Sequence, residues 1–128
     1  MVIAGIDYSL TCPAICIHDS HDGVFNFDNA HFYCGDLKDV LDSDIMSDIE
    51  KPNIVIVDPP RPGLHPKTIK NLIKLLPEKI IYVSCNPATM ARDIEILASE
   101  KYMIKDLQPI DMFPHTPHIE CIITLIKK

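Results

Sequence analysis

Short apolar runs alternate with amphipathic stretches along most of the chain, which indicates a sheet covered by helices. The apolar runs predict strands at residues 2–7, 14–18, 31–34, 53–57, 79–83, 103–107 and 118–126, with another extended piece at 24–27. Apolar residues at three- and four-residue spacing predict helices at 37–50 and 67–76, and Pro87 can open a third helix that runs to residue 100. From residue 32 onward, continuous apolar strands alternate with helices, which is typical of a parallel sheet.

The connections between these elements limit the possible arrangements of the strands in the sheet. Residues 59–66 (PPRPGLHP) hold four prolines, so we expect neither helix nor mid-sheet strand there. The short connection at 111–118 predicts that the last two strands form an antiparallel pair. The first strand (VIAGID, residues 2–7) ends on an acid and is followed by a polar loop. It can therefore pair beside residues 54–57 and cover a sheet edge that would otherwise be exposed.

The composition is that of one soluble domain or a fragment of one. The chain has 128 residues, of which 47% are hydrophobic and 23% charged. No apolar run is long enough to span a membrane, and the N-terminus has no basic region typical of a secretory signal. The five cysteines are interpreted as reduced thiols of a cytoplasmic protein. Because the net charge is −6, we expect any nucleic-acid binding to be weak, to be confined to a local surface, or to be helped by protein parts outside this sequence.

Ligands of such sheets bind beyond the carboxyl ends of the strands, and three successive strand ends here carry polar or reactive residues. These segments are Cys34–Asp36, Asp58–Arg61 and Ser84–Pro87. Cys85 is the sharpest candidate, because a thiol at a helix N-terminus gains thiolate character and becomes nucleophilic. The alternative is a small buried residue, since free cysteines are among the most buried types.

Three carboxylates are further candidates, each with a structural alternative. Asp58, held by a stiff proline turn, can accept hydrogen bonds from a planar ligand such as a base edge, or it can cap the next helix with Arg61 as its ion-pair partner. Glu120 starts an apolar strand and can act as a general base, or it can simply face water. Asp36 follows Gly35 and can hold an adenosine group, or it can be a helix N-cap.

A metal site near the C-terminus is not predicted. His115, His118 and Glu120 are potential ligands, but they lie on or beside a proline-broken loop. Cys121 is expected to point to the strand face opposite Glu120.

Three segments together are similar to known catalytic motifs. YVSCNPATMARD (82–93), VDPPRPGL (57–64) and DMFPHTPHIE (111–120) resemble the motifs of RNA (uracil-5-)-methyltransferases that use S-adenosylmethionine. The resemblance runs from about His31 to Lys128. It implies an α/β fold with a truncated Rossmann-like methyltransferase sheet, mostly parallel with an antiparallel last strand.

The resemblance also implies roles for single residues. Cys85 would attack C6 of uracil, and Glu120 would be the general base that removes the C5 proton. Asp58 would lie near the target base and the cofactor, and Asp36 near the adenosine of S-adenosylmethionine. Further substrate-binding residues are then expected in the same motifs: Arg61, Asn86 and His115. The expected partner is RNA, either tRNA or rRNA, and the base must be exposed before it can react.

The N-terminal part departs from this family. The family's glycine-rich cofactor turn should precede residue 31, and no such motif is present there. Residues 1–30 instead resemble the opening β-hairpin of phage Holliday-junction resolvases of the RNase H-like fold, in which Asp7 would match a metal-binding carboxylate. The sequence is therefore interpreted as a chimera, with a resolvase-like segment at 1–30 and the C-terminal part of a methyltransferase catalytic domain at 31–128.

Three functional hypotheses remain. The first is a uracil-C5 methyltransferase fragment, whose activity alone is in question because of the missing turn. The second is a non-catalytic recombined α/β scaffold, or one that needs a partner or another copy to cover an incomplete sheet edge. The third is a metal-dependent Holliday-junction nuclease, which rests on Asp7 alone.

Overall fold

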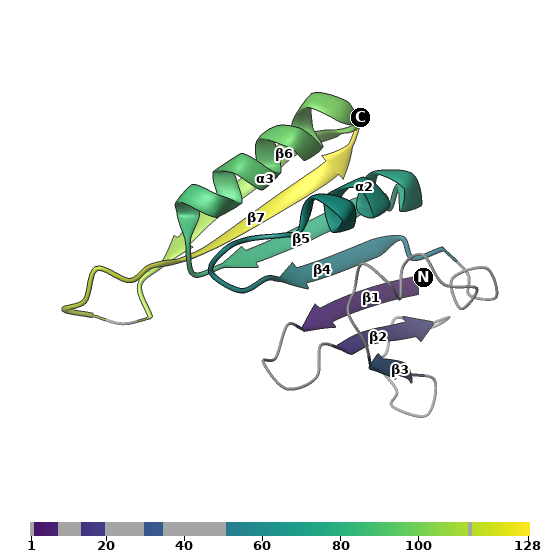
Figure 1. Ribbon diagram of the computed structural model, residues 1–128, viewed down its shortest axis with the longest axis horizontal. Helices are drawn as coiled ribbons and strands as arrows, with labels where there is room; N and C mark the ends of the chain where they lie inside the picture. Colours follow the sequence, from purple (N-terminus) through teal and green to yellow (C-terminus); the bar gives the residue numbers. More distant parts are fainter. Residues whose placement is uncertain (1, 8–13, 20–29, 35–50, 113) are drawn as a thin grey trace.

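The computed structural model describes residues 2–7, 14–19, 30–34, 51–112 and 114–128. They form a seven-stranded sheet and two helices, α2 and α3 (Figure 1). The strands are β1 (Val2–Asp7), β2 (Ala14–Asp19), β3 (Ala30–Cys34), β4 (Ile54–Asp58), β5 (Lys79–Ser84), β6 (Tyr102–Ile110) and β7 (Glu120–Lys127), and the helices are α2 (Pro66–Leu75) and α3 (Pro87–Glu100). The expected extended piece at 24–27 and helix at 37–50 lie outside the described residues.

The strands follow the order β3-β2-β1-β4-β5-β7-β6. β1 pairs with β4, and β4 with β5, in parallel, whereas the other neighbours pair antiparallel. Only β2 and β7 therefore run against the other five described strands. The expected placement of β1 beside β4 is confirmed, and so is the antiparallel pair β6–β7. From β1 the chain proceeds to one side of the sheet and then returns to β4 on the other, which makes the β1/β4 boundary a topological switch point.

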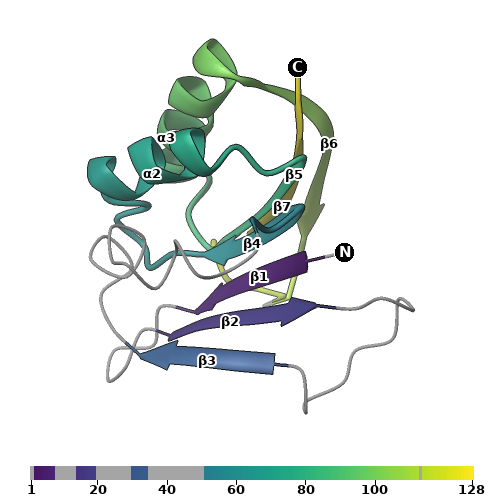
Figure 2. The same ribbon diagram turned by 90° about the vertical axis from the view of Figure 1, so that its right-hand side faces the viewer.

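Both described helices cover the same face of the sheet (Figure 2). On that face the strands bury alternate residues, because successive side chains of a strand point to opposite faces. The apolar core joins side chains from β4, β5 and β7 to side chains from the two helices. Its fully buried members include Val55, Val57, Ile80, Tyr82, Leu125, Leu72 and Leu97.

Local signals fix where the helices start and stop. Asn86 caps α3, with its Oδ1 accepting from the Ala88 N–H, and Pro87 occupies the first turn. α2 begins at Pro66, so the last proline of the 59–66 segment opens a helix, contrary to the expectation that the whole segment is non-helical. A proline is tolerated there because its missing N–H would have no partner in the first turn.

Strand β6 is longer than predicted and includes Pro109. Among the described strands, β6 is an edge strand that pairs with β7 alone, and a proline is tolerated on an edge strand. A register shift between Ile104 and Asp106 further interrupts the ladder. No helix in the described part of the chain is long and apolar enough to cross a membrane.

Candidate functional site

The polar strand ends meet at one edge of the sheet. The register pairs Asp7 of β1 with Asp58 of β4, and Ala14 of β2 with both Asp7 and Cys34 of β3. Cys34 is thus three strands away from Asp58, about 14 Å at the usual strand spacing. The sequence expectation that three strand ends share one edge is correct, but β1 and β2 lie between the first of them and the other two. Asp36 lies outside the described residues.

The ladder between β5 and β7 ends next to Cys85 and Glu120. Its last pair is Ser84 with Cys121, so Cys85 directly follows β5 and Glu120 begins β7 at the same end of the ladder, where Glu120 pairs with Ile110 of β6. Cys121 is buried on the helix-covered face and Glu120 is half-buried, which agrees with the predicted opposite orientation of these neighbours.

Asp58 follows the same alternation at the end of β4. Val57 is buried beneath the helices, and Asp58 is exposed. The three predicted catalytic residues, Asp58, Cys85 and Glu120, therefore lie at one end of the sheet, where β4 and β5 finish and β7 begins.

A small pocket of about 230 Å³ opens beside Cys85. Its lining comes from three segments: the proline turn, the β5–α3 junction and the loop before β7. The residues are Arg61, Cys85, Asn86, Pro87, Pro117, His118 and Ile119. The structure thus brings together three predicted site residues, Arg61, Cys85 and Asn86. His115 is exposed, has a φ of 70°, and does not line this pocket.

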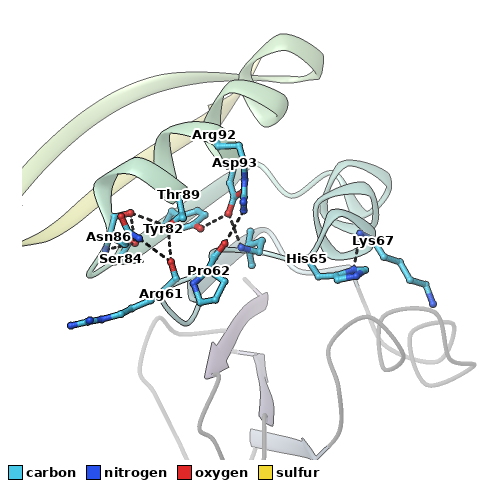
Figure 3. A network of polar contacts seen from close by, with 11 residues as sticks. Arg61, Pro62, His65, Lys67, Tyr82, Ser84, Asn86, Thr89, Arg92 and Asp93 are labelled. Carbon is cyan, nitrogen blue, oxygen red and sulfur yellow. Dashed lines mark hydrogen bonds and ion pairs between the residues drawn. The ribbon is translucent and has the colours of Figure 1, made fainter.

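Hydrogen bonds tie the proline turn to the start of α3 (Figure 3). The carbonyl oxygen of Arg61 accepts from Asn86 Nδ2 at 3.1 Å and from Thr89 Oγ1 at 2.9 Å. The Arg61 side chain points away from this network (Figure 3) and is exposed, so it is accessible to a ligand. Asn86 is engaged at both ends of its amide, in capping α3 and in holding the turn.

A buried carboxyl group lies behind this contact. Asp93 is 0% exposed, and its Oδ2 accepts from the Leu64 N–H at 2.6 Å and from the Tyr82 hydroxyl at 2.7 Å. Its Oδ1 accepts from Arg92 Nε at 2.9 Å and Nη2 at 2.6 Å. Burial and the hydrogen bond to Asp93 raise the pKa of Tyr82 well above its usual value, so its hydroxyl stays a donor.

Sequence reasoning did not single out this network or the lining residues His118 and Ile119 as parts of the site. One signal for Asp93 was available, because an acid interrupts the apolar stripe Met90, Ile94 and Leu97 of α3. Such a residue is buried only if it is paired. Within the described ranges, no group of three or more His, Cys, Asp or Glu side chains could hold a metal ion.

The chain matches a family model described as tRNA (uracil-5-)-methyltransferase over residues 38–128. The chain belongs to this family. Several relatives in the curated set are similar to the same part of the protein. An uncharacterized RNA methyltransferase of Bacteroides thetaiotaomicron is 46% identical over 97 residues, which is 76% of this chain and 21% of the relative. One from Streptococcus pyogenes is 50% identical over 78 residues, 61% of this chain and 17% of the relative.

A solved methyltransferase structure is similar in both sequence and fold. It is the Pyrococcus abyssi tRNA (uracil-54, C5)-methyltransferase in complex with S-adenosyl-L-homocysteine, with a TM-score of 0.56 and 49% identity, covering 61% of this chain and 19% of the other. The complex of M1.HpyAVI with SAM has a TM-score of 0.55 at 16% identity, covering 75% of this chain and 52% of the other, and supports the fold alone. The chain spans about a fifth of the length of the curated methyltransferases it matches.

Proposed function

We propose that this chain is the C-terminal catalytic part of an RNA uracil-C5 methyltransferase that works through a covalent cysteine adduct. The observation that carries the proposal is that Cys85 and Glu120 directly flank the last pair of the β5–β7 ladder, Ser84 with Cys121, while Asp58 ends the neighbouring strand β4. A nucleophile, a base and an orienting acid then serve one small ring held in the pocket beside Cys85.

The chemistry divides between the three residues. The Cys85 Sγ forms a bond to C6 of uracil, and the electron pair of the C5–C6 double bond moves to make C5 nucleophilic. When bound, S-adenosylmethionine supplies the methyl group that C5 takes. The Glu120 carboxylate then accepts the C5 proton, the C5–C6 double bond re-forms, and the Cys85 Sγ leaves by β-elimination. Asp58 orients the base through hydrogen bonds while Arg61 and His115 contact the RNA.

The cofactor position rests on topology. The β1/β4 boundary is the switch point of the sheet, where nucleotide cofactors bind in doubly wound folds. Under this proposal the ends of β1 and β4, together with Asp36 and residues 8–13, would hold S-adenosylmethionine. Residues 8–13 contain no glycine, the residue that lets a backbone approach a cofactor most closely.

The charge distribution supports RNA as the partner, either tRNA or rRNA. Residues 51–128 hold 11 of the 12 Lys and Arg but only 8 of the 18 Asp and Glu. The acidic net charge of the chain therefore comes from residues 1–50, and the part that carries Cys85 and Glu120 is basic overall. Basic surface favours contact with phosphates.

We also propose that residues 1–30 derive from a resolvase-like hairpin joined to the methyltransferase part at 31–128. The match to the family model begins at residue 38, after the hairpin. β1 and β2 pair as an antiparallel hairpin, and β1 fills the position beside β4. One aspartate, Asp7, would not by itself build the two-metal site of such a nuclease.

Covalent trapping tests the proposed function. RNA that contains 5-fluorouridine should form a stable adduct with the chain at about 1 mM S-adenosylmethionine, because fluorine at C5 cannot leave as a proton does. Cys85→Ser should abolish the adduct, and the matched variant Cys34→Ser should leave it unchanged. An adduct that survives Cys85→Ser would refute the assigned nucleophile.

The second candidate is a non-catalytic α/β scaffold, or one that needs a partner. The observation in its favour is that residues 8–13, which follow β1 in the sequence, contain no glycine. Under this hypothesis the chain folds, forms no adduct, and binds no cofactor at millimolar concentration. Adduct formation by the isolated chain would exclude it.

A further inference from the structure

The proline turn that carries Asp58 and Arg61 has few means of holding its own shape. It has one internal backbone hydrogen bond outside the regular elements, from the Gly63 N–H to the Pro60 carbonyl at 2.8 Å. Prolines 59, 60 and 62 have no N–H to donate, so the conformation of this turn depends strongly on contacts from elsewhere. Those contacts come from α3 and β5.

One face of α3 supplies most of them. Asn86, Thr89, Arg92 and Asp93 recur at helical spacing. Together they hold three residues of the turn, Arg61, Pro62 and Leu64. Asn86 and Thr89 donate to the Arg61 carbonyl, Arg92 Nη2 donates to the Pro62 carbonyl at 3.0 Å, and Asp93 accepts from the Leu64 N–H. Figure 3 shows the turn lying along this face of the helix.

Asp93 is the centre of the arrangement. Its carboxyl group accepts from the turn, from β5 through Tyr82, and from α3 through Arg92. The fit is close at Gly63, where a Cβ atom would lie 2.6 Å from Asp93 Oδ2 and 2.7 Å from Arg92 Nη2. The turn therefore lies directly against the buried carboxyl group, with no room for a side chain between them.

The same contacts determine the geometry of the proposed catalytic groups. Cys85 directly precedes Asn86, and Tyr82 lies on β5 three residues before Cys85, which follows the end of that strand. We propose that Asp93 is a positioning residue of the methyl-transfer site, whose carboxyl group sets the separation between Cys85 and the turn that carries Asp58 and Arg61. This inference rests on the proposed function for its catalytic consequence, and on the hydrogen bonds alone for its structural one.

Asp93→Asn is the direct test. An amide keeps one acceptor oxygen and turns an NH₂ group toward donors that need an acceptor, so the turn loses part of its anchorage. In the 5-fluorouridine assay, we expect the rate constant for adduct formation to fall about 10- to 100-fold at saturating RNA. The RNA concentration at half-maximal rate should stay within about twofold, because Arg61 and the basic surface remain.

The assay separates positioning from a loss of folded protein. Fewer folded molecules would lower the amplitude of adduct formation and leave the rate constant unchanged, and that result would overturn the proposal. Glu95→Gln, on the exposed side of α3, is the matched control and should change neither quantity. If Asp93→Asn does not fold, Tyr82→Phe and Thr89→Ala each remove the hydroxyl of one side chain from the network. Each variant should lower the rate constant by a smaller factor.

Amide hydrogen exchange makes the test independent of activity. In Asp93→Asn the Leu64 amide should exchange at least about tenfold faster, while the amides of Leu97 and Leu125 remain protected. If the parent chain forms no adduct, the proposed function fails for this chain, and the exchange experiment still decides the positioning role. Unchanged exchange at Leu64 would overturn it.

Discussion

Asp7 and Asp58 are register partners at the carboxyl ends of two neighbouring parallel strands. Asp7 comes from the segment that resembles a resolvase hairpin, and Asp58 comes from a methyltransferase motif. The boundary between the two segments is therefore also the switch point of the sheet, where a nucleotide cofactor is expected. Whether the junction has kept a cofactor site is the first question for experiment.

Calorimetric titration with S-adenosylhomocysteine addresses this question. We expect saturable binding with a Kd between micromolar and millimolar, so that the binding free energy is less favourable than about −8 kcal/mol. The reason is that residues 8–13 contain no glycine, which would allow the backbone to approach the cofactor closely. Asp36→Ala should weaken the binding further if Asp36 holds the adenosine. The absence of binding heat at about 1 mM ligand would contradict the cofactor proposal.

Glu120→Gln should trap the reaction after methyl transfer. A glutamine side chain cannot accept the C5 proton, so elimination stalls and the chain stays attached to RNA that contains ordinary uridine. Mass spectrometry of the purified adduct should find the added methyl group together with the Cys85 linkage. Free 5-methyluridine RNA released at the parental rate would exclude Glu120 as the base.

Gly63→Ala should destabilise the fold through the proline turn. The φ of Gly63 is +83°, and the added Cβ would meet Asp93 and Arg92 at 2.6 and 2.7 Å. We expect a loss of about 1–3 kcal/mol in the free energy of unfolding, measured by urea denaturation. Lys70→Ala, at an exposed position of α2, is the control and should stay within about 0.5 kcal/mol of the parent.

We expect the buried hydroxyl of Tyr102 to make the folded protein less stable in alkaline solution. Burial raises its pKa to about 12, and its hydroxyl donates to the Pro77 carbonyl at 2.9 Å. Between pH 10 and 12 the unfolded chain releases this proton and the folded chain keeps it, so the free energy of unfolding falls as pH rises.

Tyr102→Phe provides the comparison for this pH dependence. The variant should lose about 1 kcal/mol at pH 8 with the hydrogen bond, and its stability should decline less steeply above pH 10. Denaturation curves at several pH values measure both quantities. Equal slopes for the parent and the variant would show that Tyr102 does not cause the loss.

Most of the strands and both described helices could be predicted from the sequence, because each has a local signature. Apolar runs such as Ile54–Asp58 and caps such as Asn86–Pro87 are complete within a few residues. The grouping of Cys85 with Arg61 was also predictable, since parallel strands end at a common edge. The role of Asp93 was not, because it depends on a turn 29 residues away and on the Tyr82 hydroxyl. The exclusion of His115 from the pocket depends on a loop conformation that sequence periodicity does not describe.

Among the described strands, a single ladder joins the first 34 residues to the rest: the five pairs from Ile3 with Ile54 to Asp7 with Asp58. A slip of two residues along this ladder would keep each side chain on its own face, so the apolar pattern discriminates weakly against it. Such a slip would nevertheless move Asp7 about 6.6 Å along the strand from Asp58. The lengths of the connecting segments, rather than hydrophobicity, would then select the native register, and insertions or deletions there should be tolerated less well than substitutions.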